Sequence, residues 1–408
     1  MTDLRSRLTR LTPQDSAELL ELHRAAVTRQ RSADWPHAEV SALDEITASL
    51  PDDDGGAVPD RLGDRVLGAW SGRIAGNMMG KPVELGPTRA SIRAYLESKD
   101  AYPLRGYVPC DGPADREHLG MSGVDGATLG SVSGSVRDDD IDYTVLGLHL
   151  LEAYGTGYTT SHVAAEWLWR FPVRQVFTAE SATYRNLVAG VTVTDAGKHH
   201  NPYREWIGAL IRADIFGFVC AGHPRRAALL AHADASLSHR ANGIYGEMWA
   251  AALIASAFTA ATPEESVEES LRHIPPTSRL AHEVRLVLDQ FRDGLDWEKC
   301  LDDLDRRHAD MSWVHTINNA GALTAAVLWG GGRFTETVGL AVQAGLDTDS
   351  IGATAGAWAG AFQGASALPG HLVRPLEDRC RTGLFGFGDV SIASLAERTV
   401  ALVDRLAP

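Results

Sequence analysis

The segment GLDTDSIGATAGAWAGAFQG, residues 345–364, has four consecutive polar side chains at 347–350, followed by a long run of small residues. Asp347, Asp349 and Ser350 lie at its start, and glycine and alanine dominate the rest. Residues two apart on a helix point in nearly opposite directions, so the two carboxylates converge only on loop or extended backbone. We therefore expect a loop that enters a tightly packed helix. A helix cap needs only one such side chain, so the pair favours a cation site over a simple cap.

A second acidic cluster precedes another predicted helix. Asp138, Asp139 and Asp140 are consecutive, and an apolar stretch with leucines at 146, 148 and 151 follows them. Neighbouring carboxylates repel one another unless solvent or a cation lies between them. Carboxylate and hydroxyl oxygens, with no histidine or cysteine, suit hard cations such as Mg²⁺, Mn²⁺ or Ca²⁺. One such run is typical of a solvated surface, but two clusters at helix starts favour a metal site.

Residues 65–84, RVLGAWSGRIAGNMMGKPVE, contain a glycine at every fourth position from Gly68 to Gly80. On a helix this spacing makes one bare face. Glycine inside a helix costs about 1 kcal/mol relative to alanine. The stripe therefore predicts that another backbone or a ligand lies close to this face. Glu84 follows the helix on a loop, after Pro82.

Together these three segments resemble the motifs of the ADP-ribosylglycohydrolase family. Residues 72–84 resemble its opening motif, which is close to G-x-x-x-G-D-A-L-G-x-x-x-E, residues 138–141 its T-D-D-T, and residues 345–350 its G-x-D-T-D-[ST]. The resemblance covers roughly residues 62–408. It implies a compact all-α fold with a dinuclear cleft that holds two Mg²⁺ or Mn²⁺ ions. The metal ligands that it implies are Asp138, Asp139, Asp140, Asp347, Asp349 and Ser350.

The resemblance also implies a reaction. The family hydrolyses the bond between a ribose anomeric carbon and a nitrogen or oxygen, through an oxocarbenium-like transition state as in other glycoside hydrolysis. A metal pair can orient ribose hydroxyls and lower the pKa of a bound water. The implied catalytic carboxylates are Glu84, Asp139 and Asp140, and the sequence does not choose among them. The expected partner is an ADP-ribosyl group or a small molecule.

Several positions depart from the family pattern. Asp138 stands where the motif has threonine, and Asn77 where it has aspartate. The family's phosphate-binding loop often has the sequence G-N-G-A-x-M-R, and the corresponding residues here are 206–212, WIGALIR. Residues 238–249, SHRANGIYGEMW, resemble a family helix whose start contains [ST]-H. The substrate-binding residues that the resemblance implies are Trp206, Gly208, Arg212 and His239.

These departures leave several functions open. The first is an enzyme that cleaves a ribosyl N-glycosidic bond in an ADP-ribosylated or NAD-derived substrate. The second has the same metal core but acts on a small nucleoside-like or nucleotide-like metabolite, because a tryptophan alters the phosphate loop. The third is a binder of ADP-ribose that does not hydrolyse it. A haloacid-dehalogenase phosphatase also contains D-x-D-[ST], but there the motif follows a hydrophobic strand, whereas residues 335–345 are typical of helix and loop.

The composition narrows the class of protein. The net charge of −15 over 408 residues argues against a nucleic-acid partner or an anionic membrane surface, and it permits cationic substrates and bound metal ions. The four cysteines form no CxxC pair, which argues against a zinc site or a disulfide framework. The first residues lack the apolar core of a signal peptide, and no apolar run is long enough for a membrane helix. We expect a cytoplasmic protein; its oligomeric state cannot be predicted.

Helices must position these side chains. We expect an N-terminal helical extension and linker over residues 1–60, with a helix at 16–29, and a catalytic domain over 61–408. Within that domain the apolar pattern predicts helices at 243–261, 320–329 and 391–406. Convincing strands are scarce, and GVTVTDA, residues 190–196, is the best candidate for one.

Overall fold

The computed structural model describes residues 6–8, 10–12, 14–28, 34–37, 39–51, 56–57, 59–85, 87–119 and 125–406. The chain divides into two compact units, Met1–His37 and Ala38–Pro408. The first contains α2 (Ser16–Thr28), close to the helix predicted at 16–29, although Arg29 lies outside the described residues.

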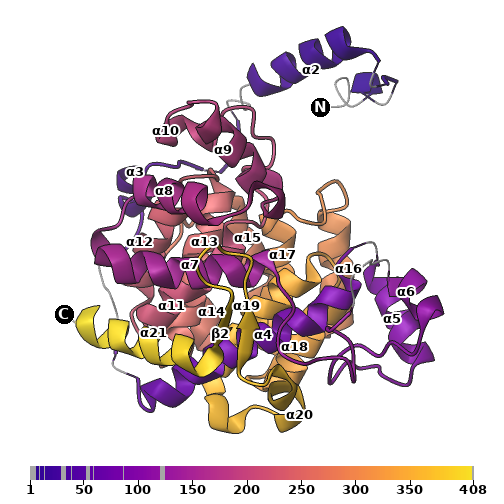
Figure 1. Ribbon diagram of the computed structural model, residues 1–408. Coiled ribbons are helices and arrows are strands. Elements are labelled where there is room, and N and C mark those ends of the chain that lie inside the picture. Colours follow the sequence, from indigo (N-terminus) through magenta and orange to yellow (C-terminus); the bar gives the residue numbers. More distant parts are fainter. Residues whose placement is uncertain are drawn as a thin grey trace. The chain divides into compact units, whose positions relative to one another are not determined.

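The second unit consists almost entirely of helices (Figure 1). They are α3 (Leu43–Thr47), α4 (Leu62–Gly80), α5 (Arg89–Ser98), α6 (Pro113–Leu119), α7 (Asp139–Tyr154), α8 (Thr160–Arg170), α9 (Thr178–Val188), α10 (Val193–Ala196), α11 (Asp214–Val219), α12 (Pro224–Ala235), α13 (Asn242–Ala257), α14 (Pro263–Leu271), α15 (Arg279–Arg292), α16 (Trp297–Arg307), α17 (Thr316–Gly330), α18 (Phe334–Gln343), α19 (Thr348–Gln363), α20 (Gly370–Val373) and α21 (Ile392–Leu406). Within the described part of the chain, the strands are β1 (Arg379–Arg381) and β2 (Asp389–Ser391), which pair antiparallel with Cys380 opposite Val390. The predicted all-α class is confirmed.

The helices predicted from apolar periodicity are present as α13, α17 and α21, with ends that differ by a few residues. The predicted strand at 190–196 is wrong, because Val193–Ala196 forms the short helix α10. Thr192 precedes this helix, and its hydroxyl donates to the carboxylate of Asp195 at 3.0 Å. A threonine followed three residues later by an acidic residue is a helix-start signal, and here it outweighs the strand preference of the valines.

The segment that precedes α4 is part of the second unit. Ile46 on α3 is fully buried, and the side chain of Glu39 is also buried. Glu39 accepts from Arg279 Nε at 2.7 Å and from Asn242 Nδ2 at 2.7 Å. The contact-based boundary at residue 37 therefore falls earlier than the predicted boundary at residue 60. Residues 52–55 and 58 of the predicted linker lie outside the described residues.

The glycine stripe packs α4 against α19, and Figure 1 shows the two helices side by side. A Cβ atom added to Gly72 would lie 2.2 Å from the carbonyl oxygen of Gly356, and one added to Gly76 would lie 2.0 Å from that of Gly352. The bare face predicted on residues 65–84 thus meets the backbone of a second glycine-bearing helix. Because the helices run antiparallel, the end of α4 lies beside the start of α19. Thr348 reinforces this junction, since its hydroxyl donates to the carbonyl of Gly80 at 2.9 Å.

No helix in the described part of the chain is both long and apolar enough to cross a lipid bilayer.

Candidate active site

A cleft of about 490 Å³ opens where the end of α4 meets the starts of α7 and α19. Its acidic lining residues are Glu84, Asp138, Asp139, Asp140, Glu180, Asp347 and Asp349. Its other polar and apolar lining residues include Lys81, Arg137, Thr178, Ser350, Leu85, Phe177, Trp206, Trp313 and Gly208. A hollow of similar size near Leu50 and Arg285 contains none of the predicted site residues. The two acidic clusters therefore meet in one place.

The start of α7 fixes the first acidic cluster. Asp138 is the N-cap, and its Oδ1 accepts from the backbone N–H of Asp140 at 3.0 Å. The same oxygen accepts from Asn77 Nδ2, on α4, at 3.1 Å. Two of the departures noted in the sequence are thus in direct contact. The motif has aspartate at 77 and threonine at 138, whereas this chain has the amide at 77 and the carboxylate at 138, so the pair still holds one carboxylate.

The start of α19 fixes the second cluster. Gly345 and Leu346 have positive φ values of 75° and 66°, and they turn the chain into the helix at its N-cap, Asp347. The backbone N–H of Asp347 donates to Asn319 Oδ1 on α17 at 3.1 Å. Asp349 accepts from its neighbour, since the N–H of Ser350 donates to Asp349 Oδ1 at 3.0 Å. The predicted loop that enters a small-residue helix is confirmed.

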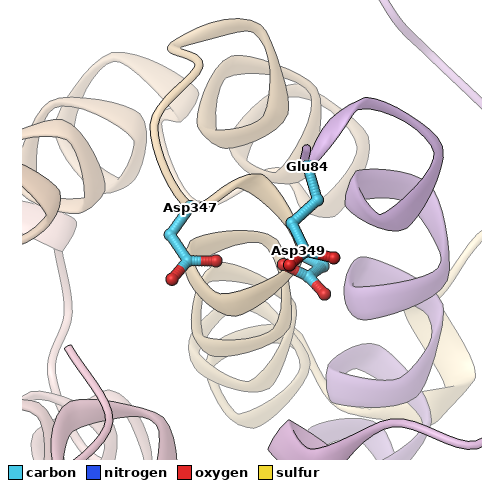
Figure 2. Close-up of side chains that lie close together, drawn as sticks. All are labelled: Glu84, Asp347 and Asp349. Carbon is cyan, nitrogen blue, oxygen red and sulfur yellow. The ribbon is translucent and has the colours of Figure 1, made fainter. Parts of the chain in front are cut away.

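The carboxylates form two sets of three that share Asp349. In each set, one oxygen from every residue lies within 4.8 Å of the others. The sets are Glu84, Asp347 and Asp349, shown in Figure 2, and Asp138, Asp140 and Asp349. Figure 2 places the carboxylates of Glu84 and Asp349 next to each other, with Asp347 directed toward them. Asp139 and Ser350 line the cleft without belonging to either set.

The electrostatics of the cluster favour a bound cation. Burial and then the neighbouring charge of Asp349 raise the pKa of Glu84 to about 10. Burial and adjacent carboxylates also raise the pKa values of Asp139, Asp140 and Asp347. One oxygen of Asp140, Oδ1, is buried and has no hydrogen-bond partner within the described structure. Hard oxygen ligands with an unpaired buried oxygen fit Mg²⁺ or Mn²⁺.

Lys81 was missed by the sequence reasoning, yet it lies inside the cluster. Its ammonium contacts Asp138 and lies 3.4 Å from Asp349 Oδ2 and 3.6 Å from Glu84 Oε2. Burial raises the pKa of Asp138, but the Lys81 charge and the hydrogen bonds from Asp140 and Lys81 together outweigh burial and lower that pKa to about 2. The spacing of three residues between Lys81 and Glu84 is a contact signal on a helical turn, and it was the one available clue.

Comparisons with known proteins identify the family and the fold. A model of the ADP-ribosylglycohydrolase family matches residues 58–406. The chain belongs to this family. A solved structure titled "ADP-ribosylglycohydrolase-related protein complex" is similar over 85% of this chain and 99% of that chain, with a TM-score of 0.52 and 20% sequence identity. At that identity the similarity shows the fold alone. No curated protein matches the chain.

In this member of the ADP-ribosylglycohydrolase family, two of the four predicted substrate-binding residues line the cleft and two lie in the core. Trp206 and Gly208 line the cleft, whereas Arg212 and His239 are buried behind it. Arg212, in a short 3₁₀ turn (Leu210–Arg212), donates to Glu180 Oε1 at 2.6 Å and also contacts Asp234. His239 Nδ1 lies 2.8 Å from the hydroxyl of Ser238, and its other ring nitrogen has no partner within the described structure.

Arg73 is a second residue that the sequence did not single out. It lies on α4, one turn before Asn77, with no exposed side-chain area. Its guanidinium donates to the carbonyl of Asp140 at 2.7 Å and to that of Ile211 at 2.6 Å, and it pairs with Asp214. Arg73 therefore ties α4 to the start of α7 and to the loop at 206–212. A buried arginine with these three partners fixes the start of α7, and with it the first acidic cluster, relative to α4.

Proposed function

We propose that this chain is a metal-dependent glycohydrolase that cleaves the N-glycosidic bond of a ribosyl group in an ADP-ribosylated or NAD-derived substrate, with Mg²⁺ or Mn²⁺ as its metal. The observation that carries the proposal is the pair of carboxylate sets that share Asp349 in one cleft. Membership of the ADP-ribosylglycohydrolase family supports the reaction class. The unpaired buried oxygen of Asp140 supports a cation at the second set.

The two carboxylate sets would hold the metal. Bound there, it would supply a polarised water and a fixed orientation of the ribose hydroxyls. Asp139 lines the cleft but belongs to neither set, so its carboxylate is free to accept the proton of the attacking water. The water oxygen bonds to the anomeric carbon, while the carbon–nitrogen bond breaks and its electron pair leaves with the nitrogen. Carboxylates near the ribose also stabilise the oxocarbenium character of the transition state.

Product analysis by mass spectrometry, with Mg²⁺ and with EDTA, tests the activity. The substrates are an ADP-ribosyl-arginine peptide, NAD, and N-ribosides with and without phosphates. We expect release of ribose or an ADP-ribosyl product in Mg²⁺ and none in EDTA. Turnover that is unchanged by EDTA would refute the metal mechanism, and ligand binding without any product would leave a non-catalytic binder.

Two variants separate the roles of the carboxylates. Asp139→Asn should lower kcat about 100-fold or more, the usual contribution of a positioned base, while Mg²⁺ affinity measured by calorimetry changes little. Asp347→Asn should weaken Mg²⁺ binding itself. Asp296→Asn is the matched control, because Asp296 caps α16 on the exposed surface and asparagine caps equally well. Full activity in Asp139→Asn would remove that residue from the mechanism.

A further inference from the structure

The described side chains that line the cleft include no unpaired cation for an anionic ligand. Seven carboxyl side chains line it, together with Lys81 and Arg137. Lys81 is enclosed by Asp138, Asp349 and Glu84. Arg137 donates to Asp142 Oδ2 at 2.8 Å and to the carbonyl of Gln175 at 3.1 Å. Among the described residues that line the cleft, both cations thus have carboxylate partners already. Away from the carboxylate sets that would hold the metal, a phosphate would meet Glu180 and no unpaired cationic side chain among the described lining residues, which disfavours binding.

The loop at 206–212 presents a carboxylate instead of an anion pocket. Gly208 faces Glu180, since a Cβ added to this glycine would lie 2.3 Å from Glu180 Oε1. Arg212 cannot turn toward the cleft, because its side chain is almost fully buried between Glu180, Asp234 and Glu247. These three carboxylates, with the carbonyls of Gly208 and Asp234 and the hydroxyl of Ser238, take the donors of the guanidinium and leave none for a diphosphate.

Acidic side chains take one backbone donor at each helix start in the cleft. The N–H of Asp140 donates to the Asp138 carboxylate, and the N–H of Ser350 donates to the Asp349 carboxylate. Free N–H groups at a helix start are the usual backbone donors to phosphate. The carboxylates beside these two N–H groups would repel a phosphate there.

The rim of the cleft is aromatic and apolar. Phe177 is 50% exposed, Trp313 41% and Leu85 45%. Trp206 lies opposite His315 in an antiparallel bridge, and the N–H of Ile207 donates to the carbonyl of Val314 at 2.9 Å. This pairing brings two tryptophan-bearing segments, 206–207 and 313–314, into one wall of the cleft. Exposed aromatic faces above an acidic floor suit a flat ring, and a positively charged ring best of all.

We propose that the substrate of this cleft is an N-riboside without a phosphate, whose leaving group is a flat, cationic heterocycle. This inference rests on the glycohydrolase function proposed above, and it narrows the substrate class. A cationic base needs no proton to depart, because the electron pair of the broken bond neutralises its nitrogen.

Three compounds that share one glycosidic bond test the inference. Nicotinamide riboside, nicotinamide mononucleotide and NAD each carry a cationic pyridinium on ribose, with zero, one and two phosphates respectively. We expect kcat/KM in Mg²⁺ to fall at least 10-fold from the riboside to either phosphorylated compound. An equal or higher kcat/KM for the mononucleotide or NAD would overturn the inference while leaving the hydrolase function intact.

Binding measurements can test the proposed substrate class even if the protein does not hydrolyse these compounds. Calorimetry with the same three compounds, in Mg²⁺ and in EDTA, measures affinity whether or not turnover occurs. Tighter binding of the riboside than of the other two compounds, without hydrolysis, would support the proposed ligand preference. It would refute the proposed hydrolase activity. Tighter binding of the mononucleotide than of the riboside, in either condition, would show that the cleft recruits phosphate and would refute the substrate class. Failure of all three compounds to bind would also refute it.

Variants at Glu180, beside the loop at 206–212, and at Trp206, in the cleft wall, test which residues produce the preference for the riboside. Glu180→Gln should reduce the preference for the riboside over the mononucleotide about 10-fold, because it removes a charge beside Gly208. Trp206→Leu should raise KM for the riboside with little change in kcat, and it does not touch the Arg212 network. The controls are Glu283→Gln, a buried carboxylate paired with Arg307 elsewhere, and Trp169→Leu, which is 75% exposed. An unchanged preference in both cleft variants would contradict the assignment.

Discussion

The close approach of α4 and α19 can be tested at Gly76, the stripe glycine whose added Cβ comes nearest to the facing helix. In Gly76→Ala, the new Cβ atom would lie 2.0 Å from the carbonyl oxygen of Gly352 and 2.8 Å from its carbonyl carbon. The clashing atoms belong to the backbone of a helix, so no side chain can rotate away. The two helices must separate by about 1 Å or more to restore normal contact distances.

The expected loss of stability follows from two opposing terms. Overpacking of this kind costs about 1–3 kcal/mol, and the missing room to adjust places Gly76→Ala at the upper end. Replacing a helical glycine by alanine stabilises the helix by about 1 kcal/mol. We therefore expect the free energy of unfolding to fall by about 2 kcal/mol, measured from the urea midpoint at an unchanged m-value.

The same displacement should reach the carboxylates. Glu84 follows α4, and Asp349 lies in the first turn of α19, so separating the helices separates two residues of one carboxylate set. Metal sites tolerate errors of only about 0.2 Å in ligand distance. Mg²⁺ affinity in Gly76→Ala should therefore fall at least 10-fold by calorimetry.

Gly63→Ala provides the matched control for this prediction. Gly63 lies on the same helix, and an added Cβ there meets nothing within 4 Å. Gly63→Ala should be neutral or slightly stabilising, with unchanged Mg²⁺ affinity. If Gly76→Ala were as stable as Gly63→Ala and bound Mg²⁺ equally well, the backbone-to-backbone packing inferred here would be refuted.

Three further substitutions test how the cluster is held. Lys81→Met should destabilise the metal-free protein, because Asp138 and Asp349 lose the cation beside them. It should also tighten Mg²⁺ binding, because no ammonium group competes with the metal. Weaker Mg²⁺ binding in calorimetry would contradict this expectation. Asn319→Ala should weaken Mg²⁺ binding severalfold by releasing the Asp347 backbone, and an unchanged affinity in calorimetry would contradict a role for this hydrogen bond. Arg73→Met should lower the thermal midpoint by several degrees by leaving Asp214 unpaired in the core, and a midpoint equal to that of the wild type would show that the pair is not structural.

The sequence could predict the acidic clusters and the glycine stripe because both follow from local chemistry. Asp347 and Asp349 lie two apart after a glycine, and that spacing requires a turn before the helix whatever the rest of the fold does. The glycines at every fourth position likewise require a close neighbour. What local chemistry cannot supply is the identity of that neighbour, which is a second glycine-bearing helix almost 300 positions away.

The parts of the site that escaped prediction depend on long-range contacts. Lys81 is one lysine after a helix, a position that is normally solvated, and only the approach of Asp138 and Asp349 makes it part of the cluster. Arg212 was predicted to bind substrate because it matches a family motif. Its position in the core depends on three acidic residues from separate helices, Glu180, Asp234 and Glu247. No spacing rule connects these four positions in the sequence.

The departures from the family motifs are easier to understand in space than along the chain. Asn77 and Asp138 exchange an amide and a carboxylate across one hydrogen bond, so the number of carboxylates at that contact is unchanged. The carboxylate now sits at the cap of α7, within reach of Lys81, which adds a positive charge inside the cluster. The charge thus lies at a different position in the floor of the cleft, while Trp206 stands in its wall. We expect these differences to change which ligand fits above the carboxylates, while the carboxylate sets themselves stay in position.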